Sequence, residues 1–272
     1  MKASRTIYEK CPFCGASEAD ILLQLDNRRS IATCNGCGLT RTSPEPEATY
    51  DEHSDYFEFH LANERQFRSY ARPQIAFVRQ YAPQGTLLDI GCGVGFLLDE
   101  ARLQGYDVQG LELNAKAVAF CASKGLKVNN CSLASCGLSD NTFEVVVMSH
   151  VLEHIHDFNS LLREVSRILK PGGTLMLSQP YHRGWLPVLL RRHWYGWVPD
   201  DHIWHFTPET LSPVLARHGL MTSGVQINSM RHSFGLNMAT LMFAPLLSRI
   251  AHIAGHGDQF YLAATKERSL ST

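Results

Sequence analysis

The sequence predicts an α/β protein with a doubly wound, mostly parallel sheet, preceded by a small cysteine-rich module. Between residues 86 and 178, short apolar stretches alternate with amphipathic ones. A glycine-rich turn at residues 91–95 follows the first apolar stretch, and two Cys-x-x-Cys pairs lie within the first 45 residues. Strands that alternate with helices at this spacing form parallel sheets with helices on both faces.

The individual elements follow from hydrophobic periodicity and from the positions of glycine and proline. We expect strands over residues 86–90, 106–111, 126–128, 143–148 and 174–178. Helices are expected over residues 61–81, 95–103, 114–124 and 158–169. Beyond residue 180, the sequence predicts a helix over 207–218, a strand over 221–228, an apolar helix over 236–254 and a strand over 259–264.

Composition excludes several classes of protein. The net charge is −1, which argues against a protein that holds nucleic acid by bulk electrostatics. No run of 18 apolar residues and no signal peptide is found, so we expect a cytoplasmic protein without a membrane span. In a reducing cytoplasm, the eight cysteines are expected to be metal ligands or packed small residues rather than disulfides.

Two carboxylates flank the glycine-rich turn. Asp89 lies two residues before Gly91, and Glu112 ends the following strand. Ligands of open α/β sheets bind at the carboxyl ends of the strands, where glycines let them approach the backbone. Asp89 would repel the pyrophosphate of a dinucleotide, and Phe96 replaces the third glycine of the dinucleotide motif. The pair instead suits a ligand that carries an ammonium group and a ribose.

Four segments resemble, in order, the motifs of class I S-adenosylmethionine (SAM)-dependent methyltransferases. Residues 88–95 resemble the first SAM-binding motif and residues 110–113 the second. Residues 143–154 resemble the fourth-strand motif of the small-molecule branch, and residues 169–175 the turn before strand five. The resemblance covers about residues 60–265. It implies a seven-stranded Rossmann-like methyltransferase sheet with SAM as the methyl donor.

The resemblance also implies which residues bind the donor. They are Asp89, Gly91, Cys92, Gly93, Gly95, Glu112, Leu113, Ser132, Leu133 and Ser149. One position departs from the pattern, because many relatives carry an aspartate after strand three that receives the adenine amino group. Here Ser132 stands in that place, and we expect it to substitute.

The four N-terminal cysteines predict a structural zinc site. Cys11 and Cys14 form one Cys-x-x-Cys pair, Cys34 and Cys37 form the second, and a glycine follows each pair. Four thiolates bind zinc tetrahedrally and leave no position open for water, so the site should be structural. The other cysteines lack such spacing and are expected to pack as small residues; they are Cys92, Cys121, Cys131 and Cys136.

Histidines are the candidate catalytic residues. His154 resembles the Glu-His pair of quinone and other O-methyltransferases and is the candidate base, with a structural hydrogen-bonding role as the alternative. Some relatives bind a divalent metal through a Glu-x-x-Glu-His pattern, but His150 replaces its first glutamate here. His205 is a second catalytic candidate. We expect residues 181–207 and 236–254 to form the acceptor pocket or a lid, with His205 near the methyl group.

These expectations combine into one functional hypothesis. Residues 1–45 form a zinc-ribbon module, residues 46–82 form a linker and N-terminal helices, and residues 83–272 form the methyltransferase domain. The acceptor is a small or medium-sized molecule, with O-methylation favoured and carbon or nitrogen open. A sugar, a quinone-like compound or a lipid-linked compound would fit, and peripheral contact with a membrane stays open. The alternatives are a zinc-ribbon ribosomal RNA methyltransferase and a SAM-binding protein without turnover.

Overall fold

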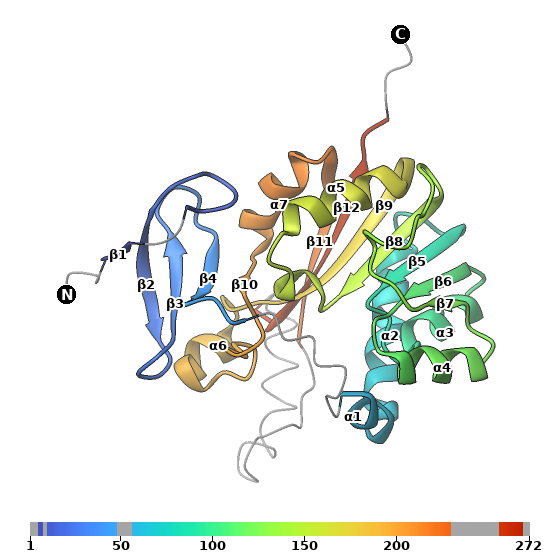
Figure 1. Cartoon of the computed structure of the whole chain (residues 1–272), viewed down its shortest axis with the longest axis horizontal. Helices are drawn as coiled ribbons and strands as arrows, with labels where there is room; N and C mark the ends of the chain where they lie inside the picture. Colours follow the sequence, from blue (N-terminus) through green and yellow to red (C-terminus); the bar gives the residue numbers. More distant parts are fainter. Residues whose placement is uncertain (1–4, 8–9, 48–55, 230–255, 269–272) are drawn as a thin grey trace.

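A computed structural model describes residues 5–7, 10–47, 56–229 and 256–268, which form two sheets (Figure 1). The larger sheet has seven strands in the order β11-β12-β9-β8-β5-β6-β7. The strands are β5 (Thr86–Ile90), β6 (Asp107–Leu111), β7 (Val128–Asn129), β8 (Phe143–Ser149), β9 (Leu169–Pro180), β11 (Leu220–Asn228) and β12 (Gln259–Lys266). Strand β12 runs antiparallel to both of its neighbours, β11 and β9, whereas the other pairs of this sheet are parallel. The predicted doubly wound α/β fold is therefore confirmed.

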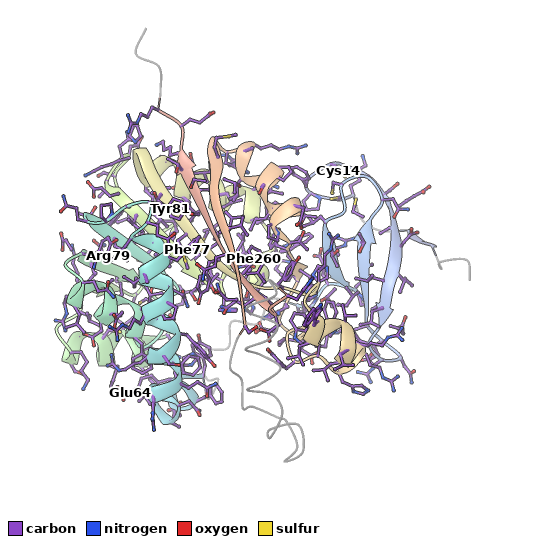
Figure 2. All side chains as sticks on the ribbon, turned by 180° about the vertical axis from the view of Figure 1, so that it is seen from behind. Cys14, Glu64, Phe77, Arg79, Tyr81 and Phe260 are labelled. Atoms are coloured by element: carbon purple, nitrogen blue, oxygen red, sulfur yellow. A yellow bond between two sulfur atoms is a disulfide. The ribbon has the colours of Figure 1, made fainter. Side chains whose placement is uncertain are left out.

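Helices cover both faces of the large sheet. They are α1 (Tyr56–Ala62), α2 (Glu64–Val78), α3 (Phe96–Leu103), α4 (Ala115–Ser123), α5 (Phe158–Ile168) and α7 (Pro208–Ala216). Alternate residues of each strand point to opposite faces. Leu87 and Val145 pack in one core with residues of α2 and α3, whereas Leu88 and Val146 pack in the other with residues of α5 and α7. Figure 2 shows α2 lying along the back of the sheet.

Two local expectations were wrong. The single helix expected over residues 61–81 is two helices, because Asn63 leaves the helical conformation at φ −113° and ψ 24°. The second of them, α2, runs through Pro73 without ending there. Strand β9 begins at Leu169 instead of Thr174, and its register with β8 shifts between Phe143 and Val145.

The smaller sheet joins the N-terminal cysteine module to a segment from far along the chain. Its antiparallel strands are β1 (Arg5–Ile7), β2 (Glu18–Gln24), β3 (Ser30–Cys34), β4 (Thr40–Ser43) and β10 (Trp204–His205). Strand β10 pairs with β4, so residues 181–207 complete the module's sheet (Figure 1). The same segment holds α6 (Trp185–Leu190) and the short helix η2 (Arg191–His193), after which Trp194 and Trp197 pack on Ile31. Residues 181–207 therefore bind the module to the large sheet.

The apolar helix expected over residues 236–254 lies outside the described residues. Among those that are described, no helix has the length and apolar character needed to cross a bilayer.

Candidate functional site

The four N-terminal thiols converge at one end of the small sheet. The Sγ atoms of Cys11 and Cys37 are 3.7 Å apart, and those of Cys14 and Cys34 are 3.5 Å apart. All four sulfurs lie within 4.8 Å of one another. Four sulfurs bound to one zinc at about 2.3 Å would be about 3.8 Å apart, so this set fits a tetrahedral zinc site.

Glycine residues permit that convergence. A Cβ atom at Gly36 would lie 2.9 Å from the Sγ atom of Cys14, so a larger residue would push into the thiol cluster. Gly15 and Gly38, which follow the two pairs, both adopt positive φ and donate their N–H groups to the carbonyls of Cys11 and Cys34. The backbone of both Cys-x-x-Cys pairs therefore makes the same kind of turn, and all four thiols point to a common centre.

The glycine-rich turn lies at the carboxyl end of β5, as predicted. Gly91, Gly93 and Gly95 all adopt positive φ, a conformation that other residues rarely take. A Cβ atom at Gly91 would lie 2.7 Å from Val151 Cγ2. Glu112 fixes the turn from the end of β6, because its Oε2 atom accepts the Gly93 N–H at 2.8 Å. The turn is therefore preorganised by the acid expected to bind the donor.

Burial makes the two acids of this site receptive to a cation. Asp89 is 3% exposed and Glu112 is 5% exposed. Burial, and then the nearby Glu112 carboxylate and Cys121 thiolate, hold the pKa of Asp89 well above its ordinary value. A positively charged ligand would offset the free-energy cost of ionising Asp89 in this buried position.

A cavity of about 300 Å³ opens beside the turn. Helices α1 and α2 form one wall with aromatic and polar residues, namely Tyr56, Phe59, His60, Phe67, Tyr70, Ala71 and Gln74. The turn and the start of α3 contribute Asp89, Gly91, Cys92, Gly93, Val94, Phe96 and Leu97. Ser149, His150 and Gln259 complete the lining. Five of the ten predicted donor residues therefore line one cavity: Asp89, Gly91, Cys92, Gly93 and Ser149.

His150 is the histidine of the β8 end that faces this cavity. It has a φ of 56°, which places a non-glycine residue in the left-handed region directly after the strand. Its Nδ1 atom lies 3.2 Å from Glu153 Oε1, and its Nε2 atom lies 2.9 Å from the Gln259 side-chain amide. An Nδ1–H that donates to Glu153 leaves Nε2 as an acceptor on the cavity side.

Glu153 is fully buried and charged. Burial alone would raise its pKa, but the hydrogen bond from His150 and the nearby His154 and His150 charges lower it to about 2. Gln179 also donates to its Oε2 atom at 2.8 Å. A carboxylate in this position fixes the orientation and tautomer of the His150 ring.

The two histidines predicted as catalytic lie elsewhere. Within the described structure, neither His154 nor His205 lines the cavity. His154 has its Nδ1 atom 3.2 Å from Asp201, and this ion pair raises its pKa although burial opposes the rise. His205 is buried in β10, where its Nε2 atom lies 2.9 Å from Thr42 Oγ1. Burial keeps the pKa of His205 well below its ordinary value, so the ring stays neutral.

The sequence places His150 just past β8, facing the expected site, but favours His154 as the base; Gln259 is the cavity residue that it does not indicate. His150 is the first residue after β8, at the ligand-binding edge. Gln259 arrives from the last strand, β12, which pairs with β9 beside β8, and no local sequence signal marks that contact.

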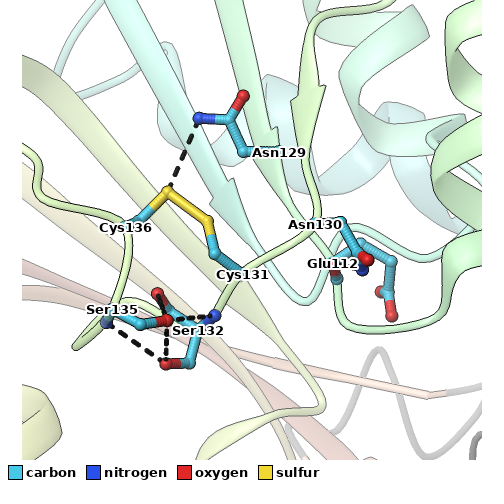
Figure 3. Close-up of a disulfide and its surroundings, with 7 residues drawn as sticks. All are labelled: Glu112, Asn129, Asn130, Cys131, Ser132, Ser135 and Cys136. Carbon is cyan, nitrogen blue, oxygen red and sulfur yellow. Dashed lines mark hydrogen bonds between the residues drawn. A yellow bond between two sulfur atoms is a disulfide. The ribbon is translucent and has the colours of Figure 1, made fainter.

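The loop after β7, where the adenine contact was expected, holds a disulfide. Cys131 and Cys136 are joined, with their Cα atoms 5.5 Å apart (Figure 3). The expectation that these two cysteines are separate packed residues was therefore wrong. A turn between them, in which Ser132 and Ser135 hydrogen-bond through their hydroxyls at 2.9 Å, brings them together. Three further residues predicted to bind the donor lie near this edge. Leu113 and Ser132 are exposed to solvent, and Leu133 is buried.

Comparison with known proteins identifies the family. The profile of the methyltransferase domain family matches residues 62–222, more than half of the chain, and the chain therefore belongs to that family. The ubiquinone biosynthesis O-methyltransferase of Nitrobacter winogradskyi is 28% identical over 146 residues, which cover 49% of this chain and 56% of that protein. The chain spans about half the length of the curated relatives it matches.

Solved structures show the same fold. A SAM-dependent methyltransferase from Archaeoglobus fulgidus superposes with a TM-score of 0.58 at 19% identity, covering 76% of this chain and 99% of that chain. The 1,6-didemethyltoxoflavin-N1-methyltransferase of Burkholderia thailandensis superposes with a TM-score of 0.56 at 15% identity, covering 90% and 98%. The large sheet is therefore that of the class I SAM-dependent methyltransferases.

Proposed function

We propose that this protein transfers a methyl group from SAM to a hydroxyl oxygen of a small-molecule acceptor. One observation carries the proposal: a single cavity joins the acidic glycine-rich turn to His150. The first feature suits a cationic nucleoside donor, and the second suits proton removal from an acceptor. The similarity to ubiquinone biosynthesis O-methyltransferases supports oxygen as the acceptor atom.

The donor site is proposed at the ends of β5 and β6. SAM supplies a methyl group on a sulfonium and is therefore already activated for transfer. The sulfonium and ammonium charges of SAM would stabilise the ionised form of Asp89. Gly93 leaves room for the ligand against the backbone, since among the described residues a Cβ there would meet only Tyr56, at 3.8 Å and beyond. Glu112 would accept the ribose hydroxyls while it holds the turn.

His150 is the proposed general base, in place of His154. His150 lines the cavity, and displacing the Gln259 amide from its Nε2 atom would free that atom to accept the acceptor's proton. The buried Glu153 carboxylate would stabilise the imidazolium that forms. The His154 ring is instead engaged by Asp201 outside the cavity, which suits a structural role.

The acceptor is proposed to carry an apolar ring. The α1–α2 wall of the cavity places Tyr56, Phe59, Phe67 and Tyr70 opposite the glycine-rich turn. Aromatic side chains bind flat apolar groups through their faces and edges. A hydroxylated aromatic compound would therefore fit better than a free sugar.

We also propose that residues 1–45 form a zinc-binding module and that residues 83–272 form the methyltransferase domain, linked by residues 46–82. The spacing of the four sulfurs supports zinc. Purified protein should contain about one zinc per chain. Elemental analysis of Cys34→Ser should show most of that zinc lost, and a zinc-free wild-type protein purified without chelator would contradict the assignment.

Incubation with isotopically labelled SAM tests the activity itself. A panel of phenols and catechols, matched with the corresponding anilines and with free sugars, should give labelled product and S-adenosylhomocysteine for the hydroxylated aromatic compounds. Measured SAM binding without any labelled product would support a SAM-binding protein that does not turn over. Preferential labelling of the anilines would replace oxygen with nitrogen.

A further inference from the structure

The disulfide closes the loop that follows β7 into a ring of six residues, 131–136. Ser132 lies inside this ring, and so does Leu133, whose side chain is 4% exposed and belongs to the main core. Asn129, just before the ring, donates its side-chain amide to the Cys136 sulfur at 3.5 Å (Figure 3). The ring therefore fixes both an exposed turn and a residue that packs inward.

Asn130, the residue that precedes the ring, hydrogen-bonds to the proposed donor site. The side-chain amide of Asn130 donates to the carbonyl oxygens of Glu112 and Leu113, at 2.9 and 2.8 Å. Glu112 in turn accepts the Gly93 N–H. Asn130, which lies beside Glu112 in Figure 3, is therefore the one residue between Cys131 and the end of β6.

We propose that Cys131 and Cys136 form a thiol–disulfide exchange site and that their redox state sets the affinity of the donor site. The inference rests on the proposed function, because that function places SAM next to Glu112. The reacting partner is a dithiol. One of its thiolates attacks one cysteine sulfur, the Cys131–Cys136 bond breaks, and a mixed disulfide forms. The second dithiol sulfur then attacks the mixed disulfide and displaces the cysteine held in it, so that both cysteines end as thiols and the dithiol as a disulfide.

The position of the pair suits such an exchange. Both cysteines are partly exposed, and Ser132, Ala134 and Ser135 between them are exposed to solvent. By contrast, Cys92 and Cys121 near the glycine-rich turn are buried, at 8% and 0% exposure. A dithiol can therefore reach the 131–136 pair while the buried cysteines stay protected.

The expected direction of the change in SAM affinity follows from the conformational entropy of the loop. The closed ring holds the loop in the conformation in which Asn130 hydrogen-bonds to the end of β6, whereas the reduced loop must be ordered again when the donor binds there. Closing a ring of this size restricts the chain enough for a change of about three- to thirtyfold in the dissociation constant of SAM. The oxidised form should bind SAM more tightly.

The test compares SAM affinity of the full-length protein before and after treatment with dithiothreitol, by calorimetry. The state of the pair can be read directly, because trypsin releases residues 128–163 as one peptide that holds Cys131 and Cys136 and no other cysteine. This peptide is lighter by two hydrogen atoms when the pair is oxidised. The zinc content of each sample shows whether the N-terminal cysteines were affected.

The matched control is the double variant Cys131→Ser, Cys136→Ser. It should bind SAM as weakly as reduced wild type and should not respond to dithiothreitol, and reoxidation should restore the affinity of the wild type alone. Equal affinities of oxidised and reduced wild type would overturn the inference and leave the donor site intact. A response that persists in the double variant would assign the effect to other cysteines and overturn it too. Absence of SAM binding in every form would refute the donor site itself.

Discussion

The donor edge of the large sheet and the junction between the cysteine module and residues 181–207 are built in different ways. At the donor edge, Asp89, Gly93 and Glu112 come from two consecutive strands, and their contacts span about one βα unit. At the junction, β4 pairs with β10, so Thr40 lies opposite His205 although the whole donor edge lies between them in the sequence. Local contacts define the first region, and contacts across the chain define the second.

This difference decides how each region should respond to change. A substitution at the donor edge should alter ligand binding and leave the fold largely intact, because the strands beneath it belong to both cores of the large sheet. A change at the junction should alter the stability of the module first, because three buried histidines and three buried tryptophans lie there.

The largest expected effect on binding is that of Gly93→Val. The backbone of Gly93 has a φ of 52° and borders the cavity, so valine would be strained and would fill space needed by the donor. Calorimetry should show SAM affinity lowered by more than about a hundredfold, since the added side chain occupies the space of the donor, while the backbone strain lowers stability. Gly219→Ala is the control, because Gly219 has a similar φ of 69° with open space around it and lies away from the cavity. If both variants bound SAM equally well, the turn would not be the donor site.

A smaller effect is expected for Glu112→Ala. Charged hydrogen bonds contribute roughly 1.5–3 kcal/mol each, so loss of the ribose contacts should weaken SAM about tenfold or more. The variant also loses the acceptor of the Gly93 and Asn114 N–H groups. Glu112→Gln should have an intermediate effect, because it removes the charge but keeps one oxygen, which can accept only one of these two N–H groups. Unchanged affinity in Glu112→Ala would place the donor elsewhere.

The junction should be sensitive to acid. Burial lowers the pKa of His182 and of His202 from 6.5 to about 4. The unfolded chain therefore takes up protons below about pH 6.5 that the folded chain does not bind until about pH 4, so the free energy of unfolding falls over this window as the pH drops. For one such histidine the loss at pH 5 is about 2 kcal/mol.

The variant His182→Phe tests whether the buried histidines cause this acid sensitivity. The His182 Nδ1 atom is buried and has no hydrogen-bond partner in the described part of the chain, and its ring packs beside Trp197. Phenylalanine keeps the packing and removes one titrating group, so the melting temperature should fall less between pH 7.5 and pH 5 than in wild type. His193→Phe is the control, because His193 is exposed in the same segment. A steeper fall in His182→Phe than in wild type would contradict the origin given for the acid sensitivity.

The same contrast explains what the sequence could predict. Asp89, the glycines and Glu112 were predictable because each lies at a fixed distance from a strand end, and the sheet brings strand ends together. The pairing of β10 with β4 was not, because Trp204 and His205 sit in an irregular aromatic stretch whose partner is set by the folded module. The contact of Gln259 with His150 was not predictable either, because it too joins residues far apart in the sequence. The Cys131–Cys136 bond depended on a turn through Ser132 and Ser135 that no spacing rule required.

The central claim is that chemistry occurs in the cavity at His150 and not at His154, four residues further along. Single-turnover methyl transfer, with SAM affinity measured on the same samples, tests it most directly for His150→Ala and His154→Ala. Loss of a general base lowers the rate by roughly 10²–10⁴-fold, and we expect that loss in His150→Ala with nearly unchanged SAM affinity. His154→Ala should retain most of the wild-type rate. A wild-type rate in His150→Ala together with a large loss in His154→Ala would contradict the account and return the base to the position that the sequence first indicated.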